Sequence, residues 1–187
     1  MSETPPTNGE TPVPEAGPVN LFSAADVVAI LREKGWLSGE LSEKQSIWCS
    51  RAAALLGPQV SDRAALADLL GLVFHYDARD ILQTTEAHVV MSRHAARDTL
   101  RQLALLLLDG MGLTTDRFRE VVMQLKGEMD LRGRELFHPL RLALAGRSGE
   151  GGLDRVILLL DEAAATGFAV RVKTARERIL EFCTAFE

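Results

Sequence analysis

The residues whose types could support catalysis are few and lie scattered along the chain. The two cysteines, Cys49 and Cys183, are far from each other and from the four histidines, so no zinc-knuckle spacing exists. No two histidines stand one helical turn apart in a zinc-binding pattern, and no glycine-rich loop ends in Gly-Lys-Ser/Thr. Gly110-Met111-Gly112 follows a helical pattern, which predicts a helix C-terminus rather than a dinucleotide loop. The sequence nominates no catalytic residue, metal or cofactor, and we expect a protein that is not an enzyme.

The size and composition fit a globular protein. The chain has 187 residues, of which 47% are hydrophobic and 25% charged, as in one or two soluble domains with a real core. Its longest apolar runs, 103–108 and 156–160, are far shorter than the roughly 20 residues that cross a bilayer. The first 20 residues lack the basic and apolar regions of a secretory signal. We therefore expect a cytoplasmic protein without a membrane segment.

The charge is uneven along the chain. Residues 1–90 carry six basic and twelve acidic side chains, and residues 91–187 carry fifteen basic and fourteen acidic ones. A net charge of −5 and a pI near 5.5 argue against a protein that coats nucleic acid nonspecifically, because that mode needs a large cationic surface. A small, local RNA site remains compatible with this balance.

The apolar pattern is helical. Five of the seven prolines fall within residues 1–20, which predicts a disordered tail there. From Leu21 onward the apolar residues recur at helical spacing, and the prediction is an all-α bundle of seven or eight helices in two subdomains, 21–110 and 111–187. The expected helices cover 23–34, 42–56, 61–74, 86–108, 115–130, a short segment from Pro139, 153–165 and 173–186, with a short turn over 77–82.

Three serines are the expected N-caps of the first three helices: Ser23, Ser42 and Ser61. Ser42 has Gln45 three residues later, as in a capping box. The helix over 86–108 is expected to cross the centre of the core through an apolar stripe of Val89, Ala96, Leu100, Leu103 and Leu107. Trp36 and Trp48 are expected to pack between helices.

A specific motif occupies residues 132–146, which read Arg-Gly-Arg-Glu-Leu-Phe-His-Pro-Leu-Arg-Leu-Ala-Leu-Ala-Gly. This segment resembles the C-terminal anticodon-binding region of bacterial glutamyl-tRNA synthetases, which carries basic, Gly, basic, then Leu-Phe-x-Pro-Leu-Arg and Ala-Leu-Thr-Gly. Weaker similarity extends over 22–187. The catalytic signatures of those enzymes, His-x-Gly-His and Lys-Met-Ser-Lys-Ser, are missing from this sequence. The resemblance thus implies a free-standing, truncated paralogue that does not charge tRNA by itself.

The resemblance also implies which residues touch RNA. A planar guanidinium can offer parallel donors to a base edge, and the unpaired bases of an RNA loop are splayed out where such side chains reach them. The implied residues are Arg141 and the loop residues Glu150, Gly151 and Leu153 for anticodon bases, and Arg132, Arg134 and Arg147 for phosphates.

Two positions depart from the family pattern. Ala145 stands where the family has Thr, and Gly151 stands where many members have Pro. The run 149–152 is therefore expected to be more flexible, and Glu150 places an acid that repels phosphate near the RNA surface.

The leading hypothesis is a noncatalytic tRNA-binding module that recognises an anticodon stem-loop, with tRNA(Glu) as the first candidate partner. One alternative is a helical interaction module that has lost RNA binding and engages a protein through its acidic first half or N-terminal tail. Another is a synthetase fragment that acts beside a separate catalytic subunit. The RNA-binding hypothesis is favoured if four arginines converge on one exposed patch, namely Arg132, Arg134, Arg141 and Arg147. Their pairing with nearby acids, namely Glu128, Asp130, Glu135 and Glu150, favours a protein partner.

Overall fold

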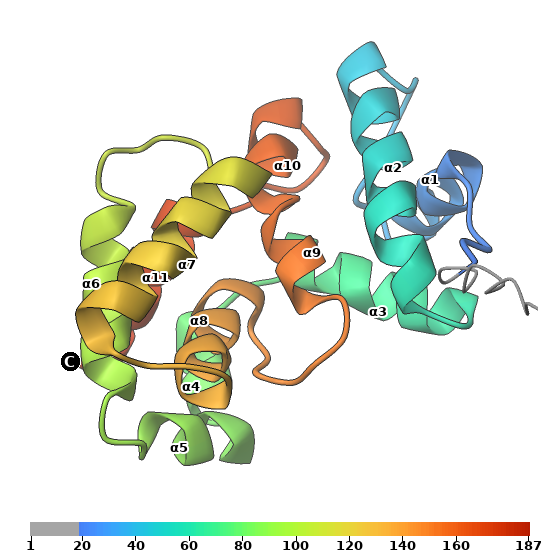
Figure 1. The fold of residues 1–187 in the computed structure, drawn as a ribbon. Helices are drawn as coiled ribbons and strands as arrows, with labels where there is room; N and C mark the ends of the chain where they lie inside the picture. The colour runs from blue at the N-terminus through green and yellow to red at the C-terminus, as the bar shows by residue number, and fades with distance from the viewer. Residues whose placement is uncertain (1–18) are drawn as a thin grey trace, which may run out of the picture.

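The structure of the protein, a computed structural model, describes residues 19–187 (Figure 1). It contains eleven α-helices and one short 3-10 helix, and that range contains no strand, which confirms the predicted all-α class. The predicted disordered tail, 1–20, falls outside the described residues except for its last two. Between residues 19 and 187 no helix combines the length and apolar character needed to cross a membrane.

The helices are more numerous and shorter than predicted. Their bounds are α1 Ala24–Glu33, α2 Glu43–Leu56, η1 Gly57–Gln59, α3 Arg63–Phe74, α4 Ala78–Leu82, α5 Thr85–Met91, α6 Ala96–Leu106, α7 Thr115–Met129, α8 Arg134–Ala145, α9 Leu153–Ile157, α10 Leu160–Thr166 and α11 Ala175–Phe186.

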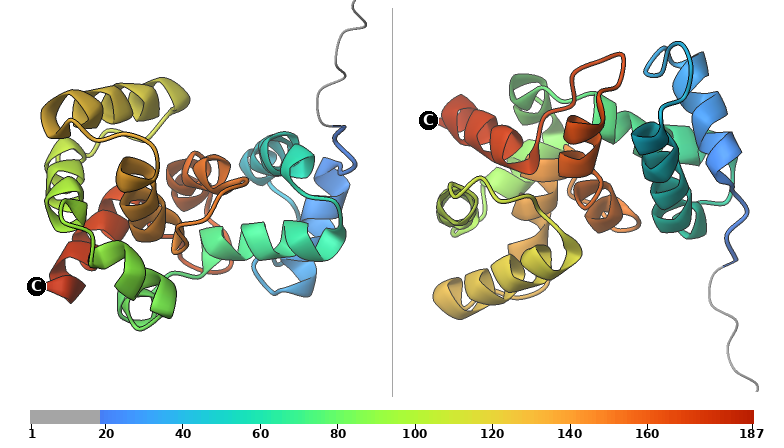
Figure 2. Two further views of the ribbon diagram at one scale, coloured as in Figure 1. Left: turned by 60° about the horizontal axis from the view of Figure 1, so that its bottom comes forward. Right: turned by 90° about the horizontal axis from the view of Figure 1, so that it is seen from above.

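The molecule is elongated, with two groups of helices joined through its centre. Helices α1, α2 and α3 form one end, α4 to α8 and α11 form the other, and α9 and α10 lie between them (Figure 1). Figure 2 shows the same separation from two other sides. Helices from before and after residue 110 pack on one another, since α6 contacts both α8 and α11. The subdomain boundary at 110 stays a prediction.

An aromatic cluster joins the α1–α3 end to the centre. The ring of Trp36 stacks on Phe74 with centroids 4.7 Å apart, and Trp48 packs edge-on against Phe74 and Phe168. The indole N–H of Trp48 donates to the carbonyl of Leu159 at 3.2 Å. Both tryptophans are buried, which confirms that they pack between helices.

A buried arginine holds the C-terminal ends of α3 and α8 together. Arg178 of α11 is fully buried, and its guanidinium donates to the carbonyls of Leu72 and Val73 in α3 and of Leu144 in α8, at 2.6–2.8 Å. The hydroxyl of Tyr76 donates to the carbonyl of Ala143. The last carbonyls of a helix have no partner within the helix and carry partial negative charge, so a cation there is favourable. This arrangement fixes α8, which carries the candidate site.

The caps of the first helices follow the sequence signals with one exception. The Ser42 hydroxyl accepts from the N–H of Gln45 at 3.3 Å, and the Gln45 side chain accepts from the N–H of Ser42 at 2.9 Å, which confirms the capping box. Ser23 precedes α1 as expected. The cap of α3 is Asp62 rather than Ser61, because the Asp62 carboxylate accepts from the N–H of Ala65 at 2.8 Å.

This one-residue shift is testable by substitution. We expect Asp62→Ala to lower the free energy of unfolding by about 1 kcal/mol, since it removes an N-cap acceptor. Ser61→Ala is the matched control and should leave the unfolding midpoint in urea nearly unchanged. A larger loss for Ser61→Ala than for Asp62→Ala would contradict the cap seen in the structure.

The long helix predicted over 86–108 is wrong, because the chain breaks into α5 and α6. At the break the hydroxyl of Ser92 donates to the carbonyl of Val89 at 2.9 Å, a side-chain bond that competes with the helical backbone pattern. The break also changes the helical phase, so Val89 is 57% exposed while Ala96, Leu100, Leu103 and Leu107 are buried as predicted. Residues 153–165 likewise form two helices rather than one, and 78–82 forms a short helix rather than a turn.

The prediction that the next helix begins near Pro139 is also wrong. Helix α8 begins at Arg134, five residues earlier, and Pro139 lies inside it at the cost of one backbone hydrogen bond. The N-cap is Gly133, whose φ of 55° and ψ of −132° suit only a residue without a side chain. The five extra residues, more than one helical turn, place 134–138 on a helix, and this determines the geometry of the candidate site.

Candidate nucleic-acid interface

The first half of α8 presents four functional side chains on one face. Arg134, Phe137, His138 and Arg141 follow the spacing i, i+3, i+4, i+7, which places them above one another on a helix. Phe137, His138 and Arg141 are half-buried, and Arg134 is exposed. The guanidinium carbon of Arg141 lies 5.2 Å from the centre of the Phe137 ring, and the ammonium of Lys126 lies 5.7 Å from it.

The loop between α8 and α9 folds back over this face and is held at two points. Arg141 donates from Nε and Nη2 to both oxygens of Asp154, at 2.7 and 2.8 Å, and from Nη1 to the carbonyl of Gly149 at 3.3 Å. Ser148 donates from its N–H and its hydroxyl to Glu86, at 2.8 and 2.6 Å. A bidentate pair of this kind sets orientation as well as distance. Arg141 is thus a clamp that connects α8, the loop and the first turn of α9.

The helix face and the loop enclose an open hollow of about 340 Å³. Its lining consists of Gly133, Arg134, Phe137, His138, Arg141 and Glu150. Glu150 reaches across it, with a carboxylate oxygen 3.8 Å from Nη2 of Arg134. Arg93, from the break between α5 and α6, donates to the carbonyl of Arg134 at 3.0 Å and adds a further cation beside the hollow. The site therefore combines guanidinium groups, a partly exposed aromatic ring and one acid.

The structure brings only some of the residues predicted to touch RNA together. Arg134, Arg141 and Glu150 share the hollow, and Gly151 follows Glu150 on the exposed part of the loop with a φ of 76°. Arg132 is exposed immediately before α8.

The two remaining predicted residues lie elsewhere. Arg147 lines a separate hollow of about 750 Å³ beside α1 and α3, where it lies 3.7 Å from Asp68. Leu153 is 4% exposed and its side chain belongs to the core. Any RNA contact at Leu153 would therefore involve its backbone.

The four arginines predicted to touch RNA do not all lie on one patch, and three of them pair with acids. Arg134 pairs with Glu150, Arg141 with Asp154 and Arg147 with Asp68, whereas Arg132 forms no ion pair within residues 19–187. Of the acids predicted as partners, Glu150 alone takes that role in the described part of the chain. Its pair with Arg134 has both side chains 77% exposed, and pairs in this setting contribute little.

The pKa of His138 depends on its burial and on the charges around the hollow. Burial, followed by the charges of Arg93, Arg134 and Arg141, lowers the pKa of His138 below its usual range, and Glu150 opposes this effect. The hollow thus disfavours an added cation and suits an anion. In the described part of the chain, no three His, Cys, Asp or Glu side chains gather in a way that could hold a metal ion.

A pH dependence of stability follows from His138. Because its pKa is lowered in the folded protein, the unfolded chain binds more protons, and stability should fall as the pH drops below the ordinary histidine value of about 6.5. We expect His138→Gln to reduce the difference in the free energy of unfolding between pH 7.5 and pH 5.5. An NMR titration of the His138 ring checks the direction, and a midpoint above the ordinary value would contradict it.

Comparison with protein families decides the relationship. A family described as an anticodon binding domain matches residues 24–165, from the start of α1 to the end of α10, and the match includes the hollow and its loop. The chain belongs to this family. Together with relatives that are glutamate-tRNA ligases, this match confirms the predicted resemblance to the anticodon-binding region of those enzymes.

Three proteins similar to this anticodon-binding domain are glutamate-tRNA ligases. A glutamate-tRNA ligase of Bacillus licheniformis is 28% identical over 130 residues, covering 70% of this chain and 26% of the relative. A glutamate-tRNA ligase of Bacillus subtilis is 25% identical over 135 residues, covering 72% and 27%, and a glutamate-tRNA ligase 2 of Syntrophus aciditrophicus is 25% identical over 129 residues. The chain thus spans about a quarter of the length of these relatives. No solved structure matches it.

Sequence reasoning missed part of the site in this anticodon-binding domain. Phe137 and His138 were not among the residues predicted to touch RNA, because the helix was expected to begin at Pro139. The spacing of Arg134, His138 and Arg141 would have revealed the shared face had α8 been extended backward. Asp154 carries no local signal, since its partnership with Arg141 arises only when the loop closes.

Proposed function

We propose that this chain is a noncatalytic module that binds the anticodon arm of a tRNA through the hollow beside the first half of α8. The observation that carries the proposal is the arrangement of Arg134, Arg141 and the loop 149–151 around one hollow, inside the segment matched by the anticodon-binding family. Exposed guanidinium groups suit phosphates, and a partly exposed ring suits an unstacked base.

The arginines would each contact or position a different part of the RNA-binding site. Arg134 and Arg132, both exposed, would meet phosphates of the anticodon loop. Arg141 would hold the loop in place through Asp154 and Gly149, with its remaining N–H groups available to a base. Arg147 lies apart and would contact a different part of the same RNA. The first candidate RNA is tRNA(Glu), because the relatives of this chain include glutamate-tRNA ligases.

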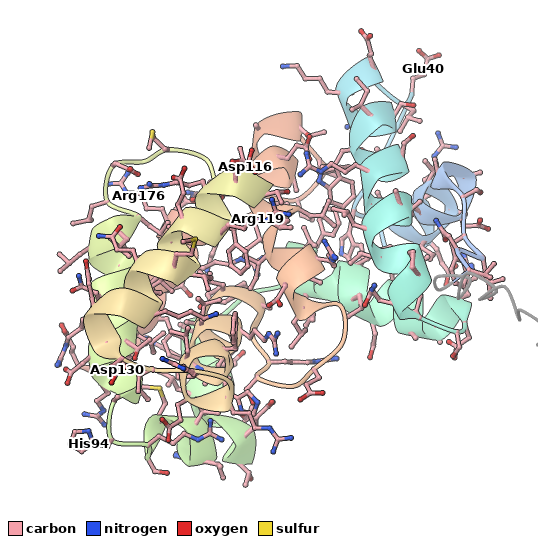
Figure 3. All side chains as sticks on the ribbon, in the orientation of Figure 1. Glu40, His94, Asp116, Arg119, Asp130 and Arg176 are labelled. Carbon is pink, nitrogen blue, oxygen red and sulfur yellow. The ribbon has the colours of Figure 1, made fainter. Side chains whose placement is uncertain are left out.

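A fluorescence-anisotropy titration of labelled tRNA(Glu), with an unrelated tRNA as competitor, tests the proposal at two salt concentrations. We expect affinity that falls with salt and prefers one tRNA. Arg134→Ala should weaken all RNAs alike and reduce the salt slope by about 1. Arg176→Ala is the control, since Arg176 is an exposed arginine on α11, well separated from α8 in the view of Figure 3. Absence of binding at tens of micromolar would overturn the proposal.

A second candidate function is a helical module that binds a protein partner. The acid partners of Arg134, Arg141 and Arg147 favour it, because each pairing reduces the charge offered to RNA. A pull-down with the full chain tests it, with Arg134→Ala as a variant that should leave capture unchanged. Capture that persists while tRNA binding is absent would favour this candidate.

A further inference from the structure

Glu150 occupies a position that conflicts with a surface for RNA. Its carboxylate lies 3.8 Å from the Arg134 guanidinium and lines the same hollow as His138 and Arg141. These two guanidinium groups are the ones that an RNA phosphate entering the hollow would meet. The carboxylate thus stands where that phosphate would be placed.

The contact between Glu150 and Arg134 is easily broken. Both side chains are 77% exposed, so water and salt screen the pair, and exposed pairs of this kind contribute little to stability. No hydrogen bond holds the Glu150 carboxylate in the described part of the chain, and the ion pair with Arg134 is its one charged contact there. Moving the Glu150 carboxylate away from Arg134 therefore requires little free energy.

The loop permits movement of Glu150 without disturbing the fold. The preceding residues are fixed, since Ser148 donates twice to Glu86 and the carbonyl of Gly149 accepts from Arg141. Leu153, beyond the loop, is anchored in the core. Between these anchors Glu150 and Gly151 are exposed, so a change at Glu150 stays local.

We propose that Glu150 is an internal competitor for the phosphate of a single-stranded RNA loop, and that RNA entering the hollow displaces its carboxylate from Arg134. The inference rests on the proposed function and adds a residue that sets selectivity. An RNA that offers only phosphates must overcome the carboxylate, whereas an RNA that also makes base contacts gains enough to do so.

The test compares tRNA(Glu) affinity of the full chain with that of Glu150→Gln by anisotropy at low and high salt. We expect Glu150→Gln to bind about three-fold more tightly at low salt, because it removes a negative charge a few ångströms from the phosphate. The ratio should approach one at high salt, where exposed charges are screened. Thermal unfolding should be unchanged, since the side chain is exposed.

Two controls separate the position of Glu150 from net charge. Glu135→Gln removes an exposed acid from the first turn of α8, outside the lining of the hollow. Glu40→Gln removes one at the opposite end of the molecule (Figure 3). Both should bind as the unchanged chain does. An equal gain in all three variants would overturn the inference and leave an effect of net charge.

The remaining outcomes show whether the inference about Glu150, the proposed function, or both are wrong. Binding by the unchanged chain with no gain in Glu150→Gln would overturn the inference alone. Binding by Glu150→Gln with none by the unchanged chain would support the inference about the carboxylate and overturn the proposed function of the unchanged chain. Absence of binding by every variant would overturn both. As a readout without RNA, the NMR titration midpoint of His138 should fall in Glu150→Gln, and an unchanged midpoint would contradict the placement of the carboxylate.

Discussion

Arg178→Met should lower the free energy of unfolding by about 3 to 5 kcal/mol, measured by urea denaturation. The methionine side chain fills much of the space but donates no hydrogen bond, so the carbonyls of Leu72, Val73 and Leu144 would be left without their partner. Burial lowers the pKa of Arg178 to about 10, so the guanidinium remains charged at neutral pH and its interaction with the two helix ends is retained there.

Two comparisons make this prediction specific. Arg178→Lys keeps a cation with fewer and differently placed donors, and its loss should be intermediate. Arg176→Met changes an exposed arginine on the same helix and should cost little. A loss below about 1 kcal/mol for Arg178→Met would show that the helix ends find other partners.

Arg141→Ala should weaken binding of a cognate anticodon stem-loop by about 1 to 3 kcal/mol, if the proposed function holds. All three nitrogens of the guanidinium already donate to Asp154 or Gly149, so we expect most of the loss to come from release of the loop. Asp154→Ala breaks the same clamp from the other side and should reproduce that loss.

Stem-loops with altered anticodons distinguish positioning from base contact. Similar losses for Arg141→Ala and Asp154→Ala across anticodons would fit a positioning role. If Asp154→Ala binds normally while Arg141→Ala loses affinity for one anticodon only, Arg141 contacts a base instead. Asp116→Ala, which breaks the exposed pair with Arg119 on α7, is the matched control.

The sequence predicted the fold class well because the signals that determine it are local. Apolar spacing and the Ser42–Gln45 capping box depend on residues within one or two turns, and both are confirmed. The break after Met91 was missed because the apolar spacing of the sequence continues through it, and a single hydrogen bond from the Ser92 hydroxyl marks the end of the helix.

The site was harder to predict, because its geometry depends on where α8 begins. Pro139 is favourable at a first helical position and placed the predicted start five residues too late. Arg178 was also missed, although it shares the buried face of α11 with Ala175, Ile179 and Phe182. An arginine at a core position is a signal in its own right, but its carbonyl partners lie over 30 residues away in sequence.

The aromatic cluster makes the intrinsic fluorescence of the molecule a local probe. The chain has two tryptophans, both are buried, and both contact the segment after α10, since the Trp48 ring packs against Phe168 and the carbonyl of Trp36 accepts from the N–H of Ala169. Emission should therefore shift to longer wavelength when α1 and α2 separate from that segment, whereas circular dichroism follows all helices. Coincident transitions would show that the whole chain unfolds as one cooperative unit. An earlier fluorescence transition would show that Trp36 and Trp48 report the detachment of α1 and α2 from the rest of the molecule, in which Arg178 still bonds α3 to α8.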